Sequence, residues 1–93
     1  MYFNFARFDV VEGKMQDAHK ALCELSAASY LDTGCYAYQV ATAMGGENAL
    51  YTLEVWDSLE HLDAHMKTPH IAVFNEKAQQ LLSCPPNVTT LEM

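Results

Sequence analysis

Hydrophobic and polar positions change their period several times along the chain, and each change predicts a new secondary-structure element. Residues 2–11 carry aromatic or β-branched side chains on both alternation sets, which predicts a strand with two apolar faces. Residues 15–31 then place apolar side chains at three- and four-residue steps, the pattern of an amphipathic helix. Gly34 follows this segment and can adopt the left-handed conformation that ends a helix.

The middle of the chain predicts a hairpin. Residues 35–42 and 49–56 are rich in aromatic, β-branched and other apolar side chains, and both segments again carry them on each face. Gly45 and Gly46 lie in the short polar gap between the two segments, and a glycine pair in such a gap favours a tight turn.

Two helical segments and a short strand complete the pattern. Asp57 is predicted to cap a short helix that runs to about Met66. Thr68 then caps a second segment over residues 69–81, whose first position is a proline that needs no hydrogen bond there. A pair of prolines ends this helix, and residues 88–91 are predicted to form the last strand.

The element order is therefore βαββαβ, which predicts an α+β fold of the ferredoxin-like type with an antiparallel sheet. A length of 93 residues is room for one domain, so we expect a single domain over residues 1–93. Strands that are apolar on both faces leave one face of the sheet uncovered by helices, and such a surface is rare on a monomer. We expect a second copy to cover it, giving a homodimer in which two sheets pack into an α/β barrel.

Charge and cysteine content narrow the function classes. The formal net charge is −7, and the five Lys and Arg residues are scattered, which argues against nucleic acid and against an anionic membrane surface as partners. No segment approaches the roughly 18 apolar residues of a membrane helix. Three cysteines without a paired spacing fit a reducing cytoplasm, with Cys84 the most exposed of them.

Residues 53–70 concentrate the candidate chemistry, since three of the four histidines follow a strand that ends in Glu54 and Trp56. These two side chains share a face because strand side chains alternate. His61 and His65 are four residues apart, as in a zinc-binding helix, but a third ligand and a catalytic glutamate are missing, so no metal site is predicted. The alternative is that they are surface residues of a short amphipathic helix, which fits His61 better than His65.

His65 is the candidate general base, because a neutral imidazole accepts a proton near pH 7. Glu54 is expected to orient this imidazole or hold it charged, and His70 to donate to an anionic substrate oxygen. Trp56, Tyr51 and Phe74 are candidates for an aromatic substrate pocket, although large aromatic side chains in a small domain mostly pack in the core.

Three motifs carry a resemblance to a known family. They are Thr33-Gly34-Cys35-x-x-Tyr38, Glu54-x-Trp56-x-Ser58 and Leu62-x-x-His65-x-x-Thr68-Pro69-His70. In order and spacing they resemble the antibiotic-biosynthesis-monooxygenase family, particularly its small quinol-monooxygenase-like members. The resemblance implies a dimeric barrel that oxidises a phenolic or quinol substrate with molecular oxygen as co-substrate and without metal, flavin or haem. His65 would then be the base, tuned by Glu54, and Trp56 and His70 would position the ring and its developing oxyanion.

Other functions remain open beside this one. Some relatives isomerise small phosphorylated signalling molecules and share the segment from His65 to His70. In haem-degrading relatives the iron ligand falls on Asn75 here, so that function is not expected. A dimer that binds a small aromatic ligand without turnover is the third alternative, since fold analogy alone does not fix activity.

Overall fold

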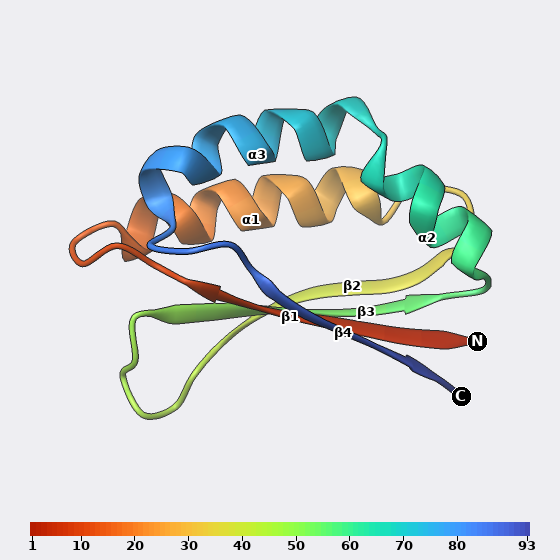
Figure 1. Ribbon diagram of the computed structural model, residues 1–93, viewed down its shortest axis with the longest axis horizontal. Helices are drawn as coiled ribbons and strands as arrows, with labels where there is room; N and C mark the ends of the chain where they lie inside the picture. The colour runs from red at the N-terminus through yellow and green to blue at the C-terminus, as the bar shows by residue number, and fades with distance from the viewer.

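The computed structural model describes all residues, 1–93, and folds them around one four-stranded sheet (Figure 1). The elements follow the order strand, helix, strand, strand, helix, helix, strand. Their bounds are β1 Tyr2–Asp9, α1 Met15–Ser29, β2 Cys35–Thr42, β3 Ala49–Trp56, α2 Leu59–Met66, α3 Pro69–Leu81 and β4 Asn87–Glu92.

The strand order in the sheet is β2-β3-β1-β4, and every neighbouring pair is antiparallel. This is the ferredoxin-like arrangement, so the predicted fold class is confirmed. The element bounds differ from the expected ones by a few residues. The first strand ends at Asp9, since Val10 makes only an isolated bridge to Leu82, and the first helix ends at Ser29.

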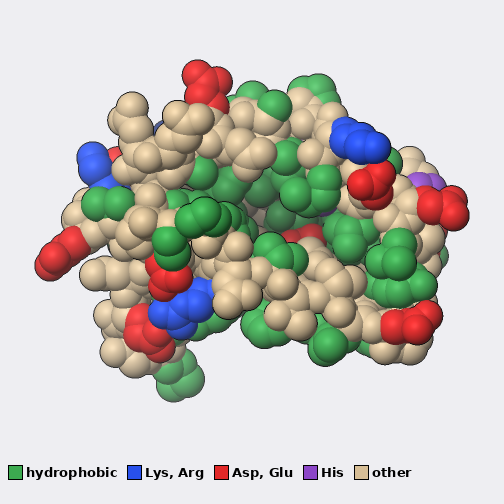
Figure 2. All heavy atoms as spheres, viewed as in Figure 1, with side chains coloured by type: hydrophobic (Ala, Val, Ile, Leu, Met, Phe, Trp, Pro, Cys, Tyr) green, Lys and Arg blue, Asp and Glu red, His purple; other side chains and the backbone are tan.

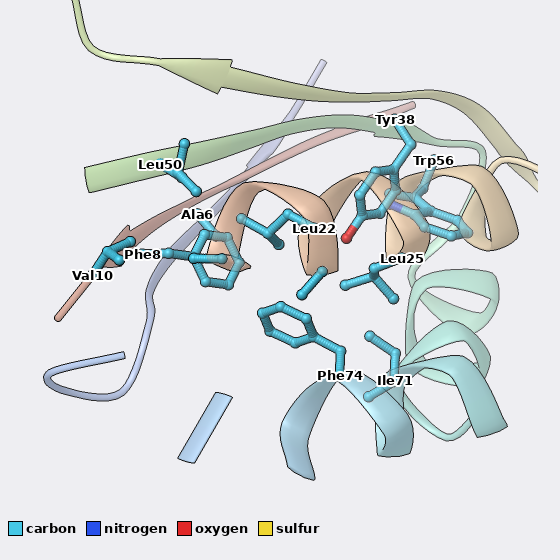
Figure 3. Close-up of a cluster of buried hydrophobic side chains, with 12 residues drawn as sticks. Ala6, Phe8, Val10, Leu22, Leu25, Tyr38, Leu50, Trp56, Ile71 and Phe74 are labelled. Carbon is cyan, nitrogen blue, oxygen red and sulfur yellow. The ribbon is translucent and has the colours of Figure 1, made fainter. Parts of the chain in front are cut away.

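The three helices lie on one face of the sheet (Figure 1). They bury the core-facing side chains of the two central strands, whereas the edge strand β4 stays exposed. Phe8 of β1 packs edge-on against Phe74 of α3, with ring centroids 5.7 Å apart. Tyr38 and Trp56 lie next to each other toward the other end of the same core (Figure 3). Since Leu22 of α1 is fully buried between these groups, the first helix is fixed against the sheet at its centre.

The opposite face of the sheet carries no helix. Phe3 and Phe5 on β1 pair with Val55 and Leu53 on β3. Leu53 is exposed, and the other three side chains are only partly buried. Toward one end of this face Arg7 donates to the Tyr51 hydroxyl. The surface is thus an apolar sheet face with a polar end, which is unusual for a side that faces water.

The turn between strand β3 and helix α2 is capped differently from the sequence-based expectation. Ser58, not Asp57, is the N-cap: its hydroxyl accepts a hydrogen bond from the backbone N–H of His61. The Asp57 carboxylate instead accepts from the His61 ring at 2.6 Å, so it is not available to the helix end. Thr68 caps α3 as expected, by accepting from the N–H of Ile71.

None of the helices combines the length with the apolar character that crossing a membrane requires.

Candidate active site

A cavity of about 100 Å³ lies between the helical layer and the sheet. Figure 2 shows the corresponding hollow, bordered by hydrophobic side chains with acidic atoms at its floor. Its wall is mostly apolar and includes Phe8, Ile71 and Phe74, while its polar groups come from Asn4, Glu54, His65 and Asn75. A small apolar cavity with a few convergent polar groups is the usual form of a site for a small molecule.

His65 lies at the end of helix α2 and is almost fully buried, with 2% of its surface exposed. Its ring packs 4.7 Å from the Trp56 ring and 5.7 Å from the Tyr38 ring, measured between centroids. These contacts fix the orientation of the imidazole. A solvated surface histidine is therefore the wrong description of this residue.

Asp32 contacts both His65 and His70, the two histidines of the third family motif. Its Oδ2 atom lies 2.8 Å from Nδ1 of His65 and 2.8 Å from Nε2 of His70. Nε2 of His65 has no hydrogen-bond partner within the protein and is not sealed off from solvent. Because the carboxylate fixes Nδ1 as the donor, Nε2 is left as the nitrogen that can accept a proton.

Glu54 was expected to orient His65, and the structure does not bear out that contact. Its Oε1 atom accepts from Nδ2 of Asn4 at 3.2 Å and from Nε1 of Trp56 at 3.0 Å, and Oε2 accepts from Thr52 at 2.9 Å. The residue is 4% exposed and forms no ion pair. A buried carboxylate without a counter-charge is costly, which marks such positions as candidates for function.

The other predicted site residues do not all lie on the same face of the sheet. Phe74 lines the cavity as predicted, whereas Trp56 and His70 are not among its lining residues. Trp56 is fully buried, donates to Glu54 and packs on His65, so it supports the site from the core. Tyr51 is on the opposite face of the sheet, where it binds Arg7, so the prediction that it lines the same pocket was wrong. The reason is the alternation of strand β3, which places odd-numbered and even-numbered side chains on opposite faces.

The cavity has no positive charge, since no Lys or Arg is among its lining residues. Lys67, the cation closest to the motif in sequence, is exposed and pairs with Asp63 at 3.0 Å. Burial raises the pKa of the Tyr38 phenol well above its ordinary value, and the Glu54 charge adds to this effect. The Tyr38 hydroxyl is therefore neutral near pH 7 and lines the cavity as an uncharged group.

His61 and His65 do not converge, although they are four residues apart. His61 pairs with Asp57, whose pKa this hydrogen bond lowers, and its side chain is 39% exposed. The three side chains whose ligand atoms do come together are Asp32, His65 and His70, within 4.8 Å of one another.

Most of the chain matches the model of one protein family. The family model described as "Antibiotic biosynthesis monooxygenase" matches residues 1–77. The chain belongs to this family, as its motifs had indicated. No curated relative matches the chain.

Solved structures share the fold over almost the whole chain. A protein from Mycobacterium tuberculosis is 24% identical with a TM-score of 0.91, and the match covers 99% of this chain and 93% of that one. A Nitrosomonas europaea protein, provisionally named an antibiotic biosynthesis monooxygenase, is 14% identical with a TM-score of 0.94, covering 100% and 98%. A Bacteroides thetaiotaomicron protein, provisionally described as an oxidoreductase, is 28% identical with a TM-score of 0.85, covering 99% and 95%.

Three residues that were not predicted to belong to the site are partners of its two buried ionisable side chains: Asp32 contacts His65, and Asn4 and Thr52 donate to Glu54. In the sequence, Asp32 lies just before Gly34, the glycine expected to end the first helix, and Asn4 and Thr52 lie within predicted strands. One signal was available: Asn4 and Thr52 share the alternation sets of the core-facing residues, where an isolated polar side chain needs a partner.

Proposed function

We propose that the chain is a cofactor-independent monooxygenase that oxidises a small phenolic or quinol-type substrate with molecular oxygen. The observation that carries the proposal is the state of His65: its Nδ1 atom is held by Asp32, and its Nε2 atom is unpartnered beside an apolar cavity. Family membership supports the reaction class.

In this mechanism Nε2 of His65 takes the proton of a substrate hydroxyl, and Asp32 stabilises the imidazolium that forms, as the carboxylate does in serine-protease triads. A phenolate gives up electrons to oxygen far more readily than a neutral phenol. For a hydroquinone the atoms balance without a further reductant, because the ring and O₂ give a hydroxyquinone and one water. The substrate supplies all the electrons, so no metal, flavin or haem is required.

Glu54 acts as a fixed negative group in the floor of the cavity. It favours the charged form of His65, whose positive charge in turn offsets that of the phenolate, and it disfavours a substrate that is already anionic when it binds. The cavity chemistry therefore supports a neutral, hydroxyl-bearing ring over a phosphorylated molecule, whose phosphate would meet no cation there. For this reason the isomerase alternative is not proposed.

We also propose that a second copy covers the open sheet face, and the apolar pairs of Phe3 with Val55 and Phe5 with Leu53 support this proposal. Leu53 is 37% exposed at the centre of this face. Light scattering should give a dimer for the wild type and a monomer for Leu53→Glu; a monomeric wild type contradicts this proposal.

Oxygen uptake with a panel of reduced quinols and polyphenols tests the activity. We compare the wild type with His65→Asn, whose amide can still donate to Asp32 but cannot accept at the position of Nε2. A loss of about a hundredfold or more is expected for a general base. His61→Asn is the matched control, because His61 is on the same helix and also binds an aspartate, but does not line the cavity.

Protein-dependent uptake that falls in His65→Asn and persists in His61→Asn supports the proposal. The absence of uptake with every substrate, or equal activity of the two variants, contradicts it.

A further inference from the structure

A cluster of three potential metal ligands consists of Asp32, His65 and His70. The proposed reaction uses Asp32 and His65 but does not need all three together. The three residues come from the loop after α1, the end of α2 and the first turn of α3. Their ligand atoms lie within 4.8 Å of one another. Two imidazoles and one carboxylate are the donors that borderline divalent cations such as Zn²⁺ prefer.

We propose that this cluster binds one divalent transition-metal ion through Oδ2 of Asp32, Nδ1 of His65 and Nε2 of His70. Oδ2 is 2.8 Å from each of the two nitrogens. Two atoms at that separation, each about 2.1 Å from a common ion, subtend an angle of about 85°, which is close to the octahedral right angle and narrower than the tetrahedral angle of Zn²⁺, so Zn²⁺ would draw the ligands slightly apart. The two nitrogens lie within 4.8 Å of each other, and the side chains must hold them within about 4.2 Å, the largest separation of two nitrogens on one ion, when the ion binds.

The charge of the cluster also favours a cation. Asp32 forms no ion pair with Lys or Arg. Its only charged-group partners are the His65 and His70 imidazoles. An ion bound by these three groups would offset the carboxylate charge, which is otherwise uncompensated.

The surroundings position the ligands and leave a way in. His65 is held by the Trp56 ring, and the Thr68 hydroxyl bonds the His65 carbonyl at 2.7 Å, which fixes the turn between the two histidines. The side chains of Asp32 and His70 are 17% and 23% exposed, so the ion can enter from solvent and keep water in its remaining positions. Such supporting contacts commonly tune metal affinity.

Metal binding has a consequence for His65 that rests on the proposed function. An ion on Nδ1 leaves the proton of the neutral ring on Nε2, so Nε2 becomes a donor and can no longer accept the substrate proton. The ion would therefore inhibit base-catalysed oxygenation.

Binding is measured first, without any turnover. Tag-free protein is titrated with Co²⁺, followed by its visible absorption, and then with Zn²⁺ in competition. One ion per chain is expected, with affinity at least about tenfold weaker in Asp32→Asn and His70→Ala. His61→Gln and His19→Ala are the controls, because these histidines have their own partners, Asp57 and Cys23, outside the cluster.

Equal weakening in the control variants, or unchanged affinity in Asp32→Asn and His70→Ala, overturns the site. The histidine ring nitrogen signals of the wild type give a second test that does not depend on variant folding. Zn²⁺ should place the metal on Nδ1 of His65 and on Nε2 of His70. Unmoved signals for these two rings overturn the site.

Oxygen uptake with and without Zn²⁺ tests the inhibitory role separately. Each protein is compared with its own metal-free activity, and Zn²⁺ inhibition of the wild type that is absent in His70→Ala supports it. Full activity with the site occupied overturns that role and the assignment of His65 as base, while the binding data still stand for the site itself.

Discussion

Substitutions of Glu54 can distinguish its effect on the stability of the fold from its effect on activity. The Glu54 carboxylate is buried at 4% exposure and accepts hydrogen bonds from Asn4, Thr52 and Trp56. Two substitutions perturb it differently. Glu54→Gln keeps the shape and removes the charge, whereas Glu54→Ala removes all of the acceptors.

The hydrogen bonds set the expected magnitudes. In Glu54→Gln the amide oxygen can still accept from Asn4 and Trp56, and the amide nitrogen can donate to the Thr52 hydroxyl, which then acts as acceptor. Weaker neutral hydrogen bonds are offset by the smaller cost of burying an uncharged group, so we expect stability to change by no more than about 1 kcal/mol. Glu54→Ala leaves three buried donors unpaired, at about 1–2 kcal/mol each, or about 3–6 kcal/mol in total.

Guanidinium unfolding measures both values. Trp56 is the only tryptophan of the chain and is fully buried, so its fluorescence reports unfolding of the core. Because this indole donates directly to Glu54, far-ultraviolet circular dichroism must give the same midpoint before the curves are compared.

A loss of more than about 2 kcal/mol in Glu54→Gln would refute the reasoning, because the charge itself would then be a net stabilising element. A loss below about 1 kcal/mol in Glu54→Ala would refute it from the other side, since the donors would have found new partners. The expected outcome is a Glu54→Gln protein that is as stable as the wild type but less active in oxygen uptake.

Three further changes have expected outcomes. The pKa of the Cys35 thiol is raised to about 11, chiefly by burial, so iodoacetamide at pH 8 should label it far more slowly than the two exposed cysteines, and faster as the pH rises toward 11; equal rates by mass spectrometry contradict this. Gly34→Ala should lose about 1–3 kcal/mol in urea unfolding, because Gly34 has φ +83° and an added Cβ would meet the side chains of Asp57 and His61; unchanged stability argues against this turn. Phe74→Ala should lose about 3–5 kcal/mol in thermal or denaturant unfolding, since the side chain packs on the core and lines the cavity; a loss below about 1 kcal/mol shows that the site collapses.

Much of the fold was accessible from the sequence because it is encoded locally. Strand alternation, helical periodicity and the Thr68-Pro69 start gave the element order, and the order gave the sheet topology. The same alternation contained the information that Tyr51 and Glu54 point to opposite faces, since they differ by an odd number of positions. Tyr51 was nevertheless predicted to share a pocket with Trp56, which this alternation rules out.

The N-cap of helix α2 shows that local sequence rules can leave two candidate residues for one role. Asp57 and Ser58 are both good N-cap residues, and the sequence pattern favoured Asp57 because Glu60 follows it three positions later. In the folded chain the Asp57 carboxylate binds the His61 ring, and Ser58 caps the helix. Local rules alone therefore do not decide between Asp57 and Ser58. The choice depends on His61, a second partner that binds the aspartate.

The partner of His65 was decided by tertiary structure alone. Asp32 is 33 positions from His65 and 38 from His70, and nothing in its own surroundings marks it as more than a polar residue after a helix. The packing of α1 and the break between α2 and α3 bring the three side chains to one point. The sequence by itself determined which elements form and which residue types are available for chemistry. Only the tertiary structure decided which carboxylate meets which imidazole, because a contact between distant segments depends on how whole elements pack.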